Sequence, residues 1–224
     1  MSGRPLVVTD ALPPERANEA ALGGKGHHLV RLRGLGLPVP PFVIVTSRAF
    51  DEAVGRSRPV EVSTGGLESA GAAALATASR RITRHIRVVG CPADLAEELR
   101  AALGERGLLG SRLAVRSSAI GEDSARHSFA GLMETRLNVA AEDVPAALVE
   151  VWASAFSPGA LAYRRRKGVD LRRIRTAVIV QEMVSAASSG VLFTRDPGNP
   201  VSGGSLIVAA RGLGEGVVQG TVEA

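Results

Sequence analysis

A lysine set among glycines is the first feature of the chain that could bind a phosphate group. Residues 22–29 read LGGKGHHL, and a helix is expected to begin at their end. Glycines let backbone N–H groups approach a phosphate closely, a helix N-terminus carries partial positive charge, and Lys25 adds a mobile cation. The segment is not a P-loop, because Ala20 and Gly26 stand where that motif requires glycine and Ser or Thr. A glycine-rich turn before a surface helix is the alternative, and this segment alone leaves both interpretations open.

A second candidate begins at the end of an apolar run. The stretch 112–135, RLAVRSSAIGEDSARHSFAGLMET, leaves a predicted buried strand at Arg116 and passes through small polar residues to Gly131 and Thr135. A guanidinium at the end of an apolar strand must reach solvent, a partner or a ligand. Together with the two serines that follow it and a glycine loop, Arg116 suits a phosphate chain. The alternative is a surface hairpin in which Arg116 pairs with Glu122 or its acidic neighbour.

A third candidate interrupts an apolar strand. The run VIVQEMV at 178–184 carries Gln181 and Glu182 in its middle. Such an interruption fits a strand edge that reads a planar, hydrogen-bonding ligand such as a nucleobase. It also fits a strand that leaves the core and exposes alternate residues to water, and the pattern alone leaves both interpretations open.

Two other groups of residues give weaker signals. The basic run YRRRKG at 163–168 could contact nucleic acid, but aromatic residues are scarce, so we expect a solvated helix face and no nucleic-acid partner. The four histidines show no metal-ligand spacing, so we predict no metal-ligating residues among them.

Composition bounds the class of protein. The chain has 224 residues, 45% of them hydrophobic and 3% aromatic, which predicts a sizeable core built mostly from Ala, Val and Leu. The single Cys91 excludes an intrachain disulfide and fits a reducing cytoplasm. No signal peptide and no membrane span are evident, so a cytoplasmic protein is expected. The net charge of +5 is carried almost entirely by arginine, so basicity by itself indicates no partner.

Local patterns predict the elements that must position the candidate residues. Leu95, Leu99 and Leu103 form an i, i+4, i+8 stripe typical of a helix, while Ser47 and Ser157 are candidate N-caps. The expected strands are 5–9, 42–46, 112–118, 134–140, 176–184, 189–194 and 205–211, and the expected helices are 27–36, 48–55, 67–86, 92–107, 142–156 and 157–169.

Four segments in the same order resemble the N-terminal ATP-binding domain of the phosphoenolpyruvate synthase and pyruvate phosphate dikinase family. They are GGKGHHLVRLRGLGLPVPPFVIVTSRAF, VRSSAIGEDSARHSFAGLMETRLNV, VWASAFSPGALAYRRRKGV and AVIVQEMVSAASSGVLFTRDP with the later GLGEGVVQG. Rifamycin-phosphorylating enzymes carry a similar domain, and the SFAG loop is more similar to the synthase and rifampin phosphotransferase type than to the dikinase type.

The resemblance implies an α+β, ATP-grasp-like fold with two lobes and a nucleotide cleft between them. The lobes would be residues 1–108, an α/β lobe with the glycine-lysine motif, and residues 109–224, a β-rich lobe that is incomplete at its C-terminus. ATP and Mg²⁺ are the implied cofactors.

The resemblance also assigns roles by position. Lys25 and Arg116 would bind phosphates and act in catalysis, Gly131 and Thr135 would belong to a loop over the phosphate chain, and Gln181 would lie in the adenine-binding strand. Glu182 would lie beside Gln181 as a further nucleotide-binding residue.

The implied activity needs partners beyond this sequence. In the family, ATP gives its β-phosphoryl group to a histidine on another domain, which passes it to pyruvate or another acceptor on a third domain. The glutamate and Gln-x-Arg that the family uses later in its ATP domain are not present here, so we expect a truncated ATP site that does not complete transfer alone. The alternatives are a non-catalytic nucleotide-binding or regulatory fragment, and the ATP domain of a rifamycin-type antibiotic phosphotransferase.

Overall fold

The computed structural model describes residues 5–55, 67, 71–120, 133–171, 174–199, 201, 203–214 and 216–217. The chain divides into two compact units, Met1–Met183 and Val184–Ala224. The predicted loop residue Gly131 and the predicted acidic partner Glu122 both lie outside the described residues.

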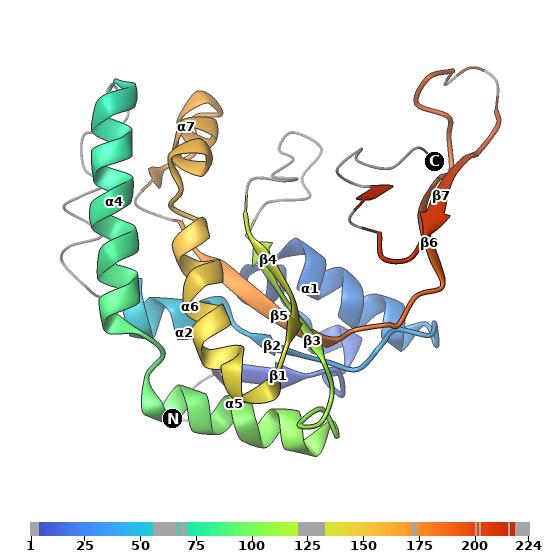
Figure 1. Cartoon of the computed structure of the whole chain (residues 1–224), viewed down its shortest axis with the longest axis horizontal. Coiled ribbons are helices and arrows are strands. Elements are labelled where there is room, and N and C mark those ends of the chain that lie inside the picture. The colour runs from blue at the N-terminus through green and yellow to red at the C-terminus, as the bar shows by residue number, and fades with distance from the viewer. Residues whose placement is uncertain are drawn as a thin grey trace. The chain divides into compact units, whose positions relative to one another are not determined.

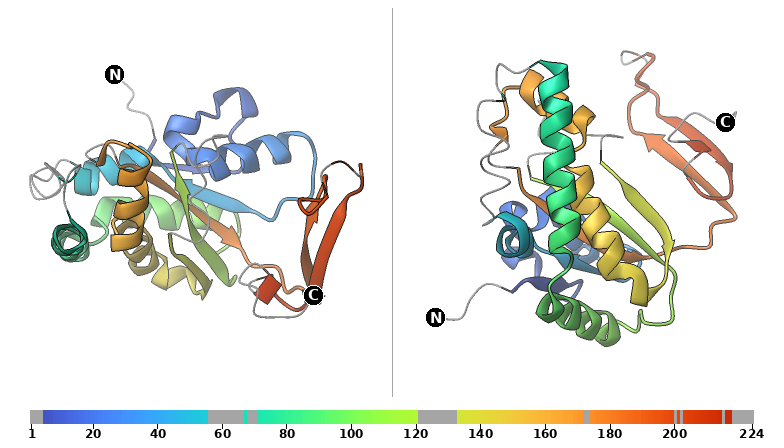
Figure 2. Two further views of the ribbon diagram at one scale, coloured as in Figure 1. Left: turned by 90° about the horizontal axis from the view of Figure 1, so that it is seen from above. Right: turned by 60° about the vertical axis from the view of Figure 1, so that its left-hand side comes forward.

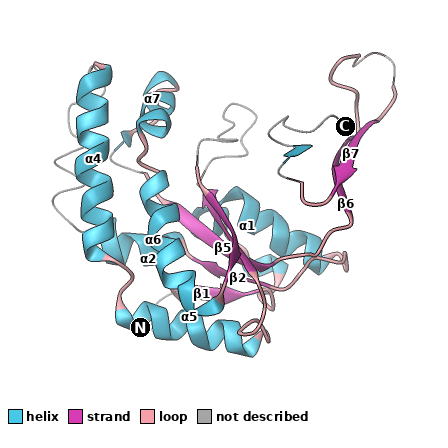
Figure 3. Ribbon diagram, in the orientation of Figure 1, coloured by secondary structure: helices cyan, strands magenta, loops and turns pink. Residues whose placement is uncertain are grey.

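The first unit is built on a five-stranded sheet in which every described pairing is antiparallel (Figures 1 and 3). The strand order is β1-β2-β5-β3-β4. The strands are β1 (Val7–Thr9), β2 (Phe42–Val45), β3 (Leu113–Ala119), β4 (Thr135–Val139) and β5 (Thr176–Glu182). Each lies within or close to a predicted strand, because runs of β-branched residues bounded by turns are a strong local signal.

Helices cover both faces of this sheet (Figure 2). Alternate residues of a strand point to opposite faces. Accordingly, Val178 and Val180 of β5 belong to the larger core cluster with α4, α5, α6 and α7, whereas Ala177 and Ile179 belong to a smaller cluster with α1. The helices are α1 (Glu19–Gly34), α2 (Ser47–Phe50), α4 (Ala72–Val89), α5 (Ala93–Glu105), α6 (Val144–Ser154) and α7 (Pro158–Arg166).

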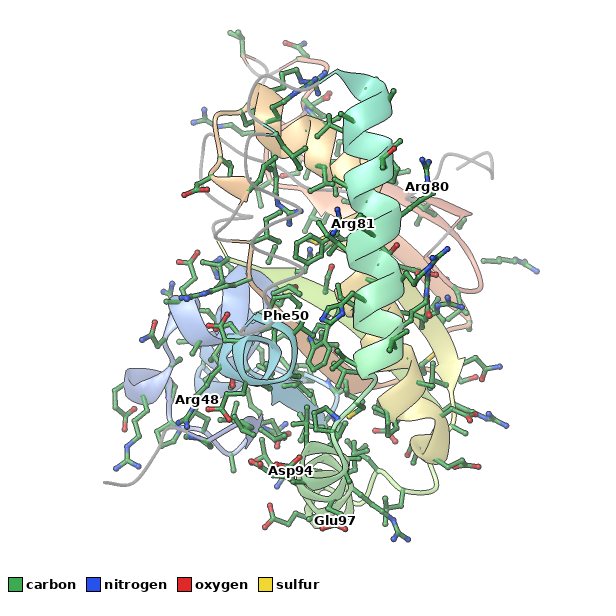
Figure 4. All side chains as sticks on the ribbon, turned by 90° about the vertical axis from the view of Figure 1, so that its left-hand side faces the viewer. Arg48, Phe50, Arg80, Arg81, Asp94 and Glu97 are labelled. Atoms are coloured by element: carbon green, nitrogen blue, oxygen red, sulfur yellow. The ribbon has the colours of Figure 1, made fainter. Side chains whose placement is uncertain are left out.

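Aromatic residues are few but central to the larger core. Phe50, at the end of α2 (Figure 4), has its ring centroid 5.7 Å from that of Trp152 in an edge-on arrangement and 6.0 Å from that of Phe156 in a stacked one. All three side chains are fully buried. The predicted Ala, Val and Leu core therefore surrounds a compact aromatic cluster, which supplies packing energy beyond simple area burial.

The predicted helix features are partly confirmed. Leu99 and the two other leucines of its stripe are buried on α5, and the Ser157 side chain accepts a hydrogen bond from the Ala160 N–H at 3.2 Å as the N-cap of α7. The prediction that Ser47 caps a helix is wrong. Thr46 occupies the cap position, and the Ser47 hydroxyl instead donates to the Ala20 carbonyl at 2.8 Å, linking α2 to α1.

The chain does not divide at the predicted boundary between residues 108 and 109. Strands from both predicted lobes form one sheet, because β2 pairs with β5 over four residues and β5 pairs with β3 over seven. Helix α5, from the first predicted lobe, packs against β1 and β2 in the same core. The division lies after Met183 instead, where the chain leaves this sheet.

The second unit contains a two-stranded antiparallel sheet formed by β6 (Ser188–Phe193) and β7 (Leu206–Arg211). The pairing runs without a shift from Ser188 opposite Arg211 to Phe193 opposite Leu206. Both strands match the predicted ranges 189–194 and 205–211.

Among the helices of the described residues, no single one has the length and apolar character needed to cross a membrane. The segments 141–154 and 158–166 reach that length and composition only as a pair bent by 43°. Their largest apolar residues, such as Trp152 and Leu161, are buried in the core cluster of the first unit.

Candidate functional site

Arg116 is a charged side chain that lies partly buried against the sheet. It pairs in register with Ile179 of β5, so it lies on the sheet face that α1 covers. Its Nη2 donates to Oε1 of Gln181 at 2.9 Å, and its buried Nε has no hydrogen-bond partner among the described residues. Burial lowers the pKa of Arg116, and no described carboxylate offsets that effect. The site therefore holds a partly desolvated cation whose Nε has no partner in the described part of the chain.

Gln181 orients this guanidinium. Its Oε1 accepts the bond from Arg116, and its Nε2 donates to the carbonyl of Pro40 at 3.1 Å. The side chain is largely buried, and both ends of its amide are engaged. The polar interruption in β5 thus has a partner within the protein, on the neighbouring strand.

Helix α1 contains a sharp kink at the glycines. Gly23 has φ 69° and ψ 170°, a conformation that is nearly exclusive to glycine, and the helix resumes after it. Gly24, Lys25 and Gly26 therefore form the first turn of a second helical segment. Backbone N–H groups at such a start have no intrahelical acceptor and carry partial positive charge.

Ser118 of β3 fastens this helix start to the sheet. Its hydroxyl donates to the Leu22 carbonyl at 2.7 Å and accepts from the Gly26 N–H at 2.9 Å. Gly23 fits against the same residue so closely that a Cβ there would lie 2.0 Å from the Ser118 carbonyl oxygen. The prediction that Ser118 offers its hydroxyl to a phosphate is therefore not supported, because the hydroxyl is engaged by the backbone of α1.

The Ser118 contact brings the two predicted cationic positions to the same sheet face. Ser118 follows Arg116 by two residues and so points to the same side, with Cα atoms about 7 Å apart along the strand. Lys25 is half-buried and is adjacent to Gly26, which Ser118 binds. No local sequence pattern signals this link, because Ser118 and Gly26 are 92 residues apart.

Two further predicted residues are placed differently from one another. Thr135, the first residue of β4, pairs in register with Arg116 and is exposed on the same face. Glu182 points to the opposite face from Gln181, and its Oε1 accepts a hydrogen bond from the Ser111 hydroxyl at 2.8 Å. The structure thus groups Arg116, Thr135 and Gln181 and directs Glu182 away from them.

Comparison with known families decides what kind of domain carries this arrangement. Residues 19–224 match the family described as "Pyruvate phosphate dikinase, AMP/ATP-binding domain". The chain belongs to this family. The match covers α1 with its glycine kink and every strand of the sheet except β1.

Individual relatives of this AMP/ATP-binding domain include several transferases. It is 38% identical to a rifampicin phosphotransferase of Streptomyces sviceus over 96% of its own length and 25% of that protein. It is 37% identical to a probable phosphoenolpyruvate synthase of Methanocaldococcus jannaschii over 89% of its length and 18% of that protein. A prodigiosin synthesizing transferase of Serratia marcescens is 35% identical over 97% of the chain and 23% of that protein. The AMP/ATP-binding domain thus spans about a quarter or less of these relatives.

A bound metal ion would need a set of suitable donor atoms in the same domain. Within the described residues, no group of three or more His, Cys, Asp or Glu side chains is arranged to hold a metal ion. Mg²⁺ prefers carboxylate, carbonyl and water oxygens. In nucleotide sites Mg²⁺ is usually held by one or two carboxylates together with phosphate oxygens, so it does not require a cluster of three protein ligands.

Proposed function

We propose that this domain binds ATP along the α1 face of β3 and β5 and serves as the nucleotide-binding part of a phosphotransferase. The observation that carries the proposal is Arg116, a partly buried guanidinium whose Nε has no hydrogen-bond partner among the described residues, beside a glycine-rich helix start. The family match to AMP/ATP-binding domains supports ATP as the anion that completes this site.

Within the described residues the partly buried Arg116 has no carboxylate partner, so an anion that enters the site has a strong partner there. A guanidinium forms paired, charge-assisted hydrogen bonds with phosphate oxygens. We assign Arg116 and Lys25 to the phosphate chain, with Gln181 fixing the plane of the guanidinium. Thr135 would add a hydroxyl donor, and Gly131 would belong to the loop over the phosphates.

The reaction we propose is of the dikinase type. ATP would give its β-phosphoryl group to a histidine on another domain, and that group would pass to pyruvate or to a rifamycin-type antibiotic. This proposal draws on the names of the relatives, which are phosphoenolpyruvate synthases and rifampicin phosphotransferases. The residues of this chain would bind and orient the triphosphate within an ATP-grasp-like cleft in the cytoplasm. Mg²⁺, if bound with the nucleotide, would neutralise phosphate charge.

Calorimetric titration with ATP tests the assignment of the two cations. Arg116→Ala and Lys25→Ala should each weaken binding by about 1.5–3 kcal/mol, because each removes a charge-assisted contact. Arg87→Ala is the matched control. Arg87 lies on α4, on the opposite side of the sheet from the site, and forms a surface ion pair at 2.8 Å with Glu150 of α6. Unchanged affinity in both site variants would remove the proposal.

A second experiment distinguishes a transferase from a non-catalytic nucleotide-binding module. The wild-type chain is mixed with labelled ATP and a separately produced phosphohistidine-carrier domain from a related enzyme. Label that appears on the carrier histidine supports phosphoryl transfer. ATP binding without such label would instead support a regulatory module.

A further inference from the structure

Thr135 pairs in register with Arg116, but only this pair and the neighbouring pair of Val115 with Arg136 hold its end of β4 to β3 before the register shifts. Thr135 begins β4, an edge strand whose pairing with β3 shifts register between Leu113 and Val115. Within the same strand, Asn138 adopts φ 59°, a left-handed conformation that interrupts regular extended structure. An edge strand held by so short a regular pairing tolerates displacement, so a further contact would help to keep Thr135 opposite Arg116.

Ser154, the last residue of α6, provides one such contact. Its hydroxyl accepts a hydrogen bond from the Glu134 backbone N–H at 3.0 Å and donates to the Val151 carbonyl at 2.7 Å. Glu134 directly precedes Thr135. A single hydroxyl therefore connects the end of a core helix to the residue from which β4 begins.

Arg164 of α7 provides a second contact one residue earlier. It is 3% exposed, its Nη1 donates to the Ala155 carbonyl, and its Nη2 lies 3.7 Å from Sδ of Met133. Met133 also packs against the larger hydrophobic core. Two adjacent residues before Thr135 are thus held by side chains from two different helices.

We propose that Ser154 and Arg164 are positioning residues of the nucleotide site, which hold Met133 and Glu134 so that Thr135 stays opposite Arg116. Neither residue contacts the nucleotide, and both act through the start of β4. The inference rests on the proposed ATP site and assigns its geometry to α6 and α7, on the far face of the sheet.

ATP affinity and thermal stability of the full chain are measured for a small set of variants. Ser154→Ala should weaken ATP binding about 3- to 10-fold, the effect of one lost hydrogen bond, and Ser154→Thr should restore it because the hydroxyl is kept. Arg164→Lys should also weaken binding, because one ammonium group cannot reach both Ala155 and Met133. Ser157→Ala is the matched control, since it removes a serine hydroxyl that caps α7 and should lower the melting temperature without changing ATP affinity.

A double-mutant cycle with Thr135→Ala shows whether Ser154 acts through that residue. In the Thr135→Ala background, Ser154→Ala should have little further effect on ATP affinity. If the wild-type chain does not bind ATP, both the proposed function and this inference are refuted. If the wild type binds ATP and Ser154→Ala binds equally well, the inference alone is overturned. A loss that persists undiminished without Thr135, or that Ser157→Ala reproduces, would also overturn it.

Discussion

Gly23→Ala tests the contact on which the geometry of the proposed phosphate site depends. Gly23 forms the kink in α1, with φ 69° and ψ 170°, and lies directly against β3. An alanine Cβ would lie 2.0 Å from the Ser118 carbonyl oxygen and 2.3 Å from its hydroxyl oxygen. Atoms cannot approach so closely, and the obstacle is backbone, so the start of α1 must move away from the sheet.

Two separate terms set the size of the effect. The backbone conformation alone costs a non-glycine residue about 1–3 kcal/mol. The displacement adds about 1–3 kcal/mol for overpacking and about 0.5–1.5 kcal/mol for each of the two Ser118 hydrogen bonds that it breaks. Gly90, the C-cap of α4, has φ 69° and ψ −163°, but an alanine Cβ there would have no described atom within 4 Å outside the neighbouring residues and its own helix. Gly90→Ala therefore carries the backbone cost without the contact cost.

Urea unfolding followed by the fluorescence of Trp152, the single tryptophan and a fully buried one, measures both variants. Gly23→Ala should be less stable than Gly90→Ala by about 2–6 kcal/mol, which is the contact cost alone. Ser118→Ala should cost about 1–3 kcal/mol, because the buried Gly26 N–H loses its acceptor. Equal destabilisation by Gly23→Ala and Gly90→Ala would refute the close packing of α1 on Ser118.

Three further predictions concern ionisable groups elsewhere in the first unit. Asp10→Asn should destabilise the fold by about 2–3 kcal/mol in urea unfolding, because the fully buried carboxylate forms ion pairs with Arg33 at 3.2 Å and with Arg106 at 2.5 Å. An unchanged midpoint of the urea transition would contradict this. Burial raises the pKa of Cys91 to about 11, so its alkylation at pH 8 should run about 100-fold slower than that of a cysteine with the ordinary value of 9.0. For the same reason, the contribution of the protonated thiol to the free energy of unfolding should be lost as pH rises from 9 towards 11. The hydrogen bond from Arg87 lowers the pKa of Glu150. Above pH 4.5 the free energy of unfolding of the wild type should therefore exceed that of Arg87→Ala by at most about 1 kcal/mol, and this difference should vanish as pH falls through the lowered pKa.

The elements that sequence patterns predicted well are those whose signals are local. The leucine stripe of α5 and the Ser157 cap of α7 each depend on residues within a few positions of one another, and both are confirmed. Helix α1 shows the limit of such patterns. Its start was predicted at residue 27 but lies at Glu19, because the turn before the kink is held by Ser118 from a distant strand.

The same distinction applies to the candidate site. An arginine at the end of an apolar strand signals a special environment, and Arg116 lies in one. The sequence could not show that Gln181 would orient it, since a polar pair within a strand does not reveal which neighbour it faces. Nor could it show that Ser118 binds backbone rather than ligand, because a free hydroxyl and an engaged one have the same sequence signature.

The contacts that position the site are mainly hydrogen bonds within the protein, whereas the contacts assigned to its ligand are between opposite charges. Ser118 holds α1 and Ser154 holds the start of β4 through hydroxyl–backbone hydrogen bonds, and Gln181 holds Arg116 through an amide. Hydrogen bonds of this kind respond little to ionic strength, whereas attraction between the half-buried Lys25 and a triphosphate is partly screened by salt. The framework therefore stays in place across conditions that change nucleotide affinity. In the proposed ATP complex, such separation would keep the phosphate oxygens in a fixed geometry, which transfer to a second group would require.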